Sequence, residues 1–168
     1  MKKQFTIVFF VAFFLCSFID ANGQSYKSAI GLRLGYPWAL TYKTFISEQG
    51  AIELYAAARQ YGYIGYNYGW VSINGAYQHH FPLNDVLDGL QWYVGGGAGL
   101  QFWHFDDNFP KAGSNQSVSL QAYLGLDYKF DEIPLNLTLD WVPNIYLNGY
   151  NNGFYGRSAN LGVRYVLK

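Results

Sequence analysis

From residue 27 to the end of the chain, apolar and polar side chains alternate with a period of two. In the clearest segment, residues 118–130, apolar side chains from Val118 to Phe130 alternate with polar or small ones such as Ser119 and Gly125. Successive side chains of a β-strand point to opposite faces, so this pattern predicts strands with chemically different faces. It predicts eight strands, at residues 27–36, 39–46, 51–59, 71–81, 90–103, 118–130, 135–141 and 159–167.

The first residues of the chain have the pattern of a secretory signal peptide. Lys2 and Lys3 precede an apolar run at residues 5–19, and small or polar residues follow as far as Gln24. The run is short for a membrane-spanning helix, which needs about 20 residues. We therefore predict a signal peptide at residues 1–24 and a single domain at residues 25–168, with an uncleaved membrane anchor as the alternative.

Charge and cysteine content exclude several classes of function. The formal net charge is zero, and removal of Lys2, Lys3 and Asp20 with the leader leaves 9 basic and 10 acidic residues. A nucleic-acid partner is not expected, because its usual basic surface is missing. The single cysteine, Cys16, lies inside the leader, so the domain has neither a disulfide nor a thiol nucleophile.

The chemistry of the two strand faces indicates which face points inward. In a soluble barrel the apolar face forms the core, whereas in a membrane barrel it contacts lipid and the polar face lines the interior. Small residues on the polar face suit the narrow interior of eight strands; they include Gly31, Gly35, Gly95, Gly97, Gly99, Gly125 and Gly162. Aromatic residues at the ends of the apolar faces suit lipid interfaces. The sequence predicts an all-β fold, an eight-stranded antiparallel up-and-down transmembrane β-barrel, with a soluble periplasmic ligand-binding barrel as the alternative.

The connections divide into two sets, which we assign to opposite ends of the barrel. The predicted outer connections are residues 36–38, 60–70, 104–116 and 147–157, and the predicted inner turns are residues 47–50, 82–89 and 131–134. Tyrosine rings at the outer end can lie among acyl chains or recognise sugars and proteins, and the sequence leaves both roles open. The outer aromatic residues are Tyr61, Tyr63, Tyr66, Tyr68, Trp70, Tyr150, Phe154 and Tyr155.

Charged residues on the inward face predict a polar network in the interior. Its members are Arg33, Lys43, Glu53, Arg59, Asp127, Lys129, Asp140 and Arg164. Charges in a small, poorly hydrated space must pair. Symmetric hairpins place Asp140 opposite Arg164 and Lys43 opposite Glu53, and we predict a contact in each pair. We interpret the network as a plug of the lumen, with an ion or proton path as the alternative.

Three longer segments resemble a known group of proteins. GLQWYVGGGAGLQF, LGLDYKFDEIPLNLTLDWVP and the closing NLGVRYVLK, together with the leader and the eight strands, look like small bacterial outer-membrane β-barrel proteins of the porin-like and OmpA-like barrel superfamily. The resemblance implies the outer membrane of a Gram-negative-type bacterium, contact with its lipid, and insertion by the assembly machinery through the C-terminal strand. The resemblance attaches no particular activity to the chain; from the closed, plugged barrel and its aromatic outer loops we expect a monomer with a structural or surface-interaction role, whose outer loops contact a surface glycan or a protein.

Few residues are candidates for catalysis or for metal binding. His104 and Asp106 lie near where lipid A palmitoyltransferases and deacylases keep their catalytic groups, and Ser117 is a nearby serine. No motif marks a nucleophile, so we expect no enzyme, with a lipid A-modifying acyltransferase or deacylase as the alternative. His79 and His80 point to opposite faces of one strand and cannot share a metal ion. No cofactor and no metal are expected.

Overall fold

The computed structural model describes residues 26–35, 37–63, 66–105, 114–149 and 152–167. The predicted signal peptide, Asp106 and Tyr150 lie outside these ranges. Within them, no helix is long and apolar enough to cross a membrane.

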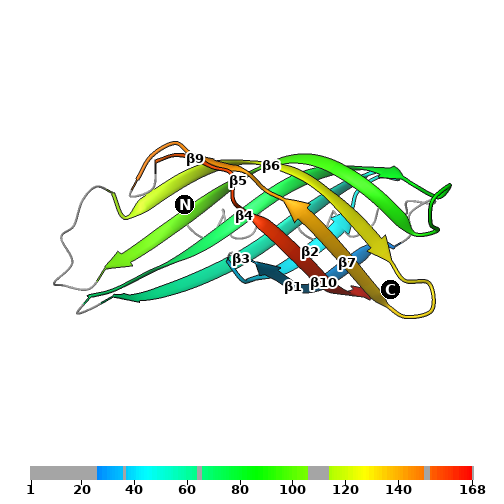
Figure 1. Cartoon of the computed structure of the whole chain (residues 1–168), viewed down its shortest axis with the longest axis horizontal. Helices are drawn as coiled ribbons and strands as arrows, with labels where there is room; N and C mark the ends of the chain where they lie inside the picture. The colour runs from blue at the N-terminus through cyan, green and yellow to red at the C-terminus, as the bar shows by residue number, and fades with distance from the viewer. Residues whose placement is uncertain (1–25, 36, 64–65, 106–113, 150–151, 168) are drawn as a thin grey trace, which may run out of the picture.

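The described strands form one closed antiparallel sheet (Figure 1). Each of the first six strands pairs with the next, β7 pairs with β10, and β10 pairs with β1, which closes an eight-stranded barrel. The short strands β8 and β9 form a hairpin whose first strand pairs with β6. This confirms the predicted fold class. The bounds are β1 Ser28–Gly35, β2 Ala39–Phe45, β3 Gly50–Tyr63, β4 Tyr66–Pro82, β5 Leu90–Phe105, β6 Gln116–Lys129, β7 Leu135–Trp141, β8 Asn144–Tyr146, β9 Gly153–Tyr155 and β10 Ala159–Leu167.

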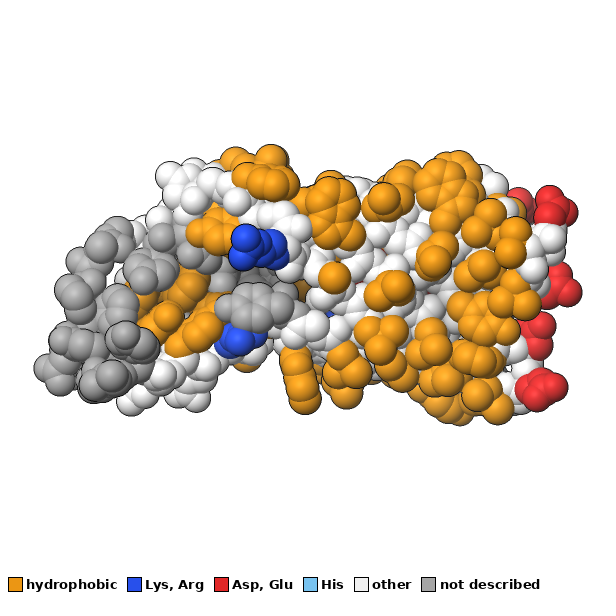
Figure 2. All heavy atoms as spheres, in the orientation of Figure 1, with side chains coloured by type: hydrophobic (Ala, Val, Ile, Leu, Met, Phe, Trp, Pro, Cys, Tyr) orange, Lys and Arg blue, Asp and Glu red, His pale blue; other side chains and the backbone are white. Residues whose placement is uncertain are grey.

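The apolar strand faces point away from the barrel axis, as predicted. Leu32 and Ile73 are exposed, whereas Arg33, Lys43 and Glu53 are buried. On the face seen in Figure 2, hydrophobic side chains form a broad belt across the barrel. Exposed members of the belt include Ile30, Leu32, Leu40, Leu54, Val71, Ile73, Val94, Leu100, Phe102, Leu120, Leu124, Leu126, Leu139, Trp141, Leu161 and Tyr165.

The height of this belt can be estimated on β5. Every outward residue from Trp92 to Phe102 is apolar or glycine, a run of ten residue steps. At about 3.4 Å per residue and a tilt of about 40°, the run rises about 26 Å along the barrel axis. This height matches the apolar band of outer-membrane barrels, roughly 25 Å.

The two ends of the barrel differ in chemistry. At the end that we call inner, short turns connect β2 to β3, β4 to β5 and β6 to β7. Acidic side chains gather at this end in Figure 2. The acidic residues of the three turns are Glu48, Asp85, Asp88, Asp131 and Glu132, all exposed. We call the opposite end outer.

The predicted outer connection at residues 60–70 is wrong in its extent, because both strands continue into it. β3 runs to Tyr63 and β4 starts at Tyr66, and these two residues are paired in register. Here the inward positions carry aromatic residues such as Tyr61 and Tyr68, and the outward positions carry Gly62, Asn67 and Gly69, so the apolar–polar contrast of the other strands is reversed in the sequence. The outward residues of this extension, Gln60 and Asn67, are polar and exposed, so the extension rises beyond the apolar belt.

The predicted outer connection at residues 147–157 contains strand β9, and its partner strand β8 lies directly before it. β7 and β8 pair with β6 in one continuous register, because Trp141 faces Leu124 and Asn144 faces Gln121. Between them lies Pro143, which has no N–H to donate to the ladder. Its carbonyl still accepts a hydrogen bond from the Ala122 N–H at 3.1 Å. β8 is therefore the continuation of β7 beyond a proline break.

The wall of the barrel has unequal height at the outer end. β3, β4 and β5 continue well past the β1–β2 hairpin, whose connection at residues 36–38 is very short (Figure 1). The β8–β9 hairpin extends the wall on the other side of β6. The rim is therefore low at β1, β2 and β10 and high at β3, β4, β5 and the β8–β9 hairpin.

Candidate functional site

Six buried charges form the central network of the barrel interior. They are Arg33, Lys43, Glu53, Asp127, Asp140 and Arg164, three basic and three acidic residues that come from six different strands. Each side chain occupies an inward position of its strand, as the alternation predicts. The network balances its own charge, which a poorly solvated interior requires.

Glu53 on β3 accepts more hydrogen bonds than either of the other two acids. Its Oε1 accepts hydrogen bonds from Arg33 Nη1 at 2.8 Å and from Thr41 Oγ1 at 2.6 Å, and it also pairs with Arg164. Its Oε2 accepts a hydrogen bond from Gln78 Nε2 at 2.6 Å. One carboxylate thus joins side chains of β1, β2, β4 and β10 across the lumen.

The other two acids hold the remaining cations. Asp140 accepts hydrogen bonds from Arg33 Nη2 at 2.7 Å and from the Tyr93 hydroxyl at 2.6 Å. Asp127 accepts a hydrogen bond from Lys43 Nζ at 2.6 Å, and a second comes from the Tyr26 hydroxyl at 3.0 Å. Arg33 therefore bridges Glu53 and Asp140, while Lys43 and Asp127 form a separate pair nearer the inner end.

The observed ion pairs differ from the predicted ones. Lys43 and Glu53 are paired in register as predicted, yet Lys43 reaches across the lumen to Asp127. Asp140 faces Asn160 in the ladder and not Arg164, because the β7–β10 register is shifted by four residues from the symmetric hairpin that we assumed. The hairpin is asymmetric because it contains the break at Pro143 and the residues between β9 and β10.

Arg59 and Lys129 lie outside the central network. Arg59 is half-buried, with its guanidinium carbon 5.0 Å from the centre of the Tyr61 ring. Lys129 pairs with the exposed Asp131 at 3.3 Å at the inner rim. Both occupy inward positions, but near the ends of the barrel.

A layer of tyrosine and amide side chains lies on the outer side of the central network. The Tyr55 hydroxyl contacts Tyr123 at 2.9 Å and Gln121 Oε1 at 3.0 Å. Gln121 in turn donates to Asn74 Oδ1 at 2.8 Å, and Asn74 donates to Ser72 Oγ at 3.0 Å. This chain of hydrogen bonds joins β3, β4 and β6 across the interior and fixes the orientation of its side chains.

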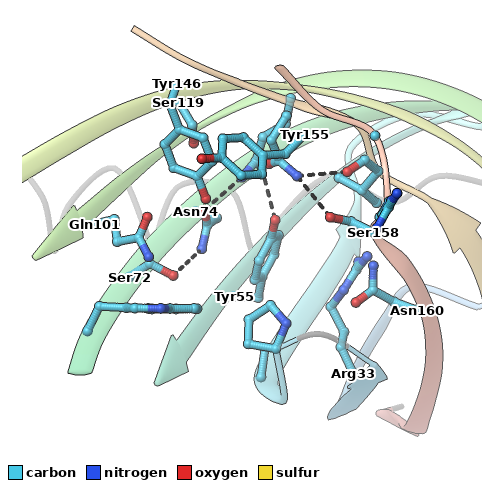
Figure 3. A pocket seen from close by; sticks show the side chains of 18 of the residues that line it. Arg33, Tyr55, Ser72, Asn74, Gln101, Ser119, Tyr146, Tyr155, Ser158 and Asn160 are labelled. Atoms are coloured by element: carbon cyan, nitrogen blue, oxygen red, sulfur yellow. Dashed lines mark hydrogen bonds between the residues drawn. The ribbon is translucent and has the colours of Figure 1, made fainter. Parts of the chain in front are cut away.

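Above this layer the barrel contains a cavity of about 620 Å³, which we call the outer cavity (Figure 3). Arg33, Tyr55, Asn74 and Gln121 contribute to its wall from the side of the central network. Aromatic and neutral polar side chains make up most of the remaining lining. The lining residues used below are Trp70, Ser72, Gln101, Trp103, Ser119, Asn144, Tyr146, Tyr155, Arg157 and Ser158.

The predicted outer aromatic residues divide between this cavity and the exterior. Tyr61, Tyr68 and Trp70 line the cavity, and the Tyr61 and Tyr68 rings stack at 4.8 Å between centroids. Phe154 and Tyr155, on β9, contribute to the lining and are also exposed. Tyr63 is the last residue of β3 and Tyr66 is the first residue of β4, and Tyr150 lies outside the described residues.

Placement of Tyr61, Tyr68 and Trp70 in the cavity wall does not fit anchoring in lipid. The strands continue to Tyr63 and from Tyr66, so the period of two still determines which side chains point inward. Sequence reasoning placed Gln101 on the inward face but did not recognise it as a site residue. It also missed Trp103, an inward aromatic residue next to an outward one.

The structure does not bring together His104 and Ser117, two of the candidate catalytic residues. His104 is exposed on the outward face of β5, whereas Ser117 is buried on the inward face of β6 and accepts a hydrogen bond from Trp103 Nε1 at 3.2 Å. Their side chains lie on opposite faces of the sheet, and Asp106 lies outside the described residues. Among the described residues, no three His, Cys, Asp or Glu side chains are grouped as metal ligands would be.

An eight-stranded barrel with an apolar exterior and a charged interior has the architecture of small outer-membrane barrels. Two solved structures have this fold and are similar to the chain. The N-terminal β-barrel domain of OprF from Pseudomonas aeruginosa has a TM-score of 0.57 and 19% identity, over 86% of this chain and 100% of that chain. Neisserial surface protein A has a TM-score of 0.56 and 16% identity, over 83% of this chain and 93% of that chain. No protein-family model matches the sequence, and no curated protein matches it.

Proposed function

We propose that the protein is an integral outer-membrane barrel with a closed lumen, which acts at the cell surface through its outer end. The observation that carries this proposal is the inverted distribution of side chains. A belt of exposed Leu, Ile, Val and aromatic residues surrounds an interior in which Arg33, Glu53 and Arg164 are almost completely buried. Such a belt is costly in water and stable in lipid, where a closed barrel also leaves no unpaired strand edge.

The closed lumen is inferred from the central network. Glu53 and Asp140 hold Arg33 between them, and Asp127 holds Lys43. Together with Arg164 these side chains cross the interior from six strands, and eight strands leave space for little more than packed side chains. A permeating ion would have to break several buried ion pairs.

Planar bilayers test insertion and closure together. We expect the purified protein to insert, to migrate on gels in a heat-dependent way, and to produce no large stable conductance. Glu53→Ala serves as the comparison, because it removes the acid that joins four strands and should raise the frequency of channel openings. A large, stable open channel in the unmodified protein would contradict the closed lumen, and failure to insert would contradict the membrane assignment.

The proposed role is not enzymatic. The supporting observation is that His104 and Ser117 point to opposite sides of β5 and β6, so these two side chains do not form a hydrogen-bonded base and nucleophile. Mass spectrometry of lipid A from cells that express the protein is expected to show unchanged acylation. A change in acylation that His104→Ala abolishes would refute this part of the proposal.

Two partners follow from the proposed location. The outward side chains of β10, Leu161, Val163 and Tyr165, would be presented to the outer-membrane assembly machinery during insertion. The outer end, with its aromatic and amide side chains, would face a glycan or protein at the cell surface. We propose that the barrel acts as a monomer, because each of its eight barrel strands pairs with two neighbours of the same chain.

A further inference from the structure

We propose that the outer cavity is a binding site for a saccharide, in which one or two sugar rings of a surface glycan are held between aromatic side chains and neutral polar groups. This inference rests on the proposed function, because it needs the outer end to face the cell exterior. The volume of about 620 Å³ lies within the range of roughly 300–1,000 Å³ that is usual for small-molecule sites.

An unsatisfied acceptor points to a ligand that donates hydrogen bonds. Gln101 lines the cavity and is 4% exposed, and its Oε1 accepts no hydrogen bond from the residues that the structure describes. A buried amide oxygen without a donor is unfavourable, so a ligand hydroxyl group that meets this oxygen after a rotation of the Gln101 side chain would stabilise the bound state. Figure 3 shows Gln101 beside Ser72 in the cavity wall.

The polar lining consists mainly of groups that both donate and accept. Hydroxyl and amide side chains approach the cavity from five strands and from the segment before β10. They are Ser72, Asn74, Gln101, Ser119, Gln121, Asn144, Ser158 and Asn160. Several of these groups already bond to one another, and sugar hydroxyl groups, which also donate and accept, match the donor and acceptor positions that remain.

The aromatic part of the lining supplies flat apolar surfaces beside these polar groups. Trp70 and Trp103 lie 6.3 Å apart between ring centroids, and the indole of Trp103 is held by its hydrogen bond to Ser117. Tyr146 and Tyr155 are edge-to-face at 5.3 Å on the β8–β9 hairpin. Rings that are held by neighbours bind a ligand surface with little loss of entropy, and the C–H faces of a sugar offer such a surface.

The charge of the described lining favours neutral ligands over cationic ones. Among the described residues that line the cavity none is acidic, and the basic ones are Arg33 and Arg157. Arg33 is already paired with Glu53 and Asp140, so its charge is compensated from within the barrel. Arg157 is exposed, where an added ion pair contributes little.

Binding is tested by titrating the purified barrel with saccharides in a zwitterionic detergent without a sugar headgroup, which would otherwise compete. The probes are glucose, galactose, N-acetylglucosamine and a disaccharide of each, at concentrations up to about 20 mM. Binding is measured by calorimetry and by the change in tryptophan fluorescence of the protein. We expect saturable binding of at least one probe. An indole probe of similar size is expected to bind more weakly.

The matched variants are Gln101→Met and Gln91→Met. Both glutamines are buried on the inward face of β5 with an unsatisfied Oε1, but only Gln101 lines the cavity. We expect Gln101→Met to weaken binding about tenfold and Gln91→Met to change it by less than about twofold. Tyr155→Ala changes an exposed side chain of β9 that also lines the cavity, so it should weaken binding without affecting folding.

The outcomes separate this inference from the proposed function. A barrel that inserts and stays closed but binds none of the probes refutes the saccharide site alone, as does equal weakening by both glutamine variants. Tighter binding of indole than of every sugar refutes the ligand class. A barrel that conducts freely in bilayers refutes the closed lumen, whatever it binds.

Discussion

Glu53 is the residue on which the interior depends most. It accepts hydrogen bonds from Arg33, Thr41 and Gln78 and pairs with Arg164. Its carboxylate therefore compensates the positive charges of Arg33 on β1 and Arg164 on β10, two strands that lie side by side. A buried ion pair contributes little in itself compared with well-packed apolar residues. Loss of one partner is costly, however, because the remaining charge stays buried without compensation.

Glu53→Gln is therefore expected to destabilise the barrel by about 3–5 kcal/mol. The substitution keeps the shape of the side chain but leaves the cations with one unit of excess positive charge. Urea unfolding of the protein in lipid vesicles measures the change. Adding Arg164→Gln should recover part of the loss, because it removes the excess charge.

Glu48→Gln is the matched control, since Glu48 is exposed in an inner turn. It should change the free energy of unfolding by less than about 0.5 kcal/mol. Equal effects of the two substitutions would show that the central network does not hold the interior together.

Small residues on the inward face provide a second prediction. A Cβ atom at Gly125 would lie 2.7 Å from Cζ of the Tyr93 ring and 2.8 Å from the Asp140 Cβ. Gly125→Ala should therefore displace the tyrosine that donates to Asp140 and cost about 1–3 kcal/mol of stability. At Gly96, on the outward face of β5, the nearest atom would be 3.9 Å away. Gly96→Ala should leave the unfolding midpoint unchanged, and a larger loss there than at Gly125 would contradict the packing described.

At the scale of the elements, hydrogen bonds fasten the β8–β9 hairpin to the barrel beyond the proline break between β7 and β8. Its hydrogen bonds to the barrel include Leu147 N–H to the Val118 carbonyl at 2.9 Å and Trp141 Nε1 to the Gly156 carbonyl at 2.6 Å. The second bond lies beside Arg157, an exposed residue between β9 and β10.

Trp141→Phe is expected to increase the rate of trypsin cleavage after Arg157 by about 2–10-fold. The substitution removes one hydrogen bond, worth about 0.5–1.5 kcal/mol, from the segment that contains the cleavage site. Limited proteolysis of the folded barrel measures the rate. Trp92→Phe, at the inner end of β5, should leave it unchanged, and equal acceleration by both variants would rule out a local effect.

How well each element could be predicted from the sequence depended on the contrast between its two faces. β7 and β10 have the predicted bounds, because leucines or valines alternate there with Asn, Thr, Asp or Arg. The extensions of β3 and β4 were missed, since their inward face carries tyrosine and their outward face carries glycine or polar residues, the reverse of the pattern used to recognise the other strands. The pairing of Asp140 with Arg164 failed because alternation fixes the face of a residue but not the register across an asymmetric hairpin.

The outer cavity was beyond reach of the sequence for the same reason. Alternation placed Gln101 and Ser119 on the inward face, but it did not say how high the surrounding wall rises. The wall height depends on where β3 and β4 end and on the β8–β9 hairpin, which has only three residues per strand. Such short strands carry too few alternations to be recognised.

At the scale of the whole molecule, the five tryptophans report on both sides of the barrel wall. Trp141 is 47% exposed on the outward face, whereas Trp103 is 7% exposed and faces the interior. In vesicles of lipids with brominated acyl chains, a variant that retains only Trp141 should be quenched strongly. A variant that retains only Trp103 should be quenched severalfold less. Equal quenching of the two variants would contradict insertion with the apolar belt in lipid.

The seam between β1 and β10 joins the start of the domain to its end, with Ser28 facing Leu167 and Gly35 facing Asn160. A nascent chain that stops before residue 159 therefore leaves both β1 and β7 with a free edge, and Arg33 and Glu53 without their neighbour Arg164. The order of synthesis thus delays closure until the final nine-residue strand has arrived. Until then, chaperones would have to shield the two open edges from other chains.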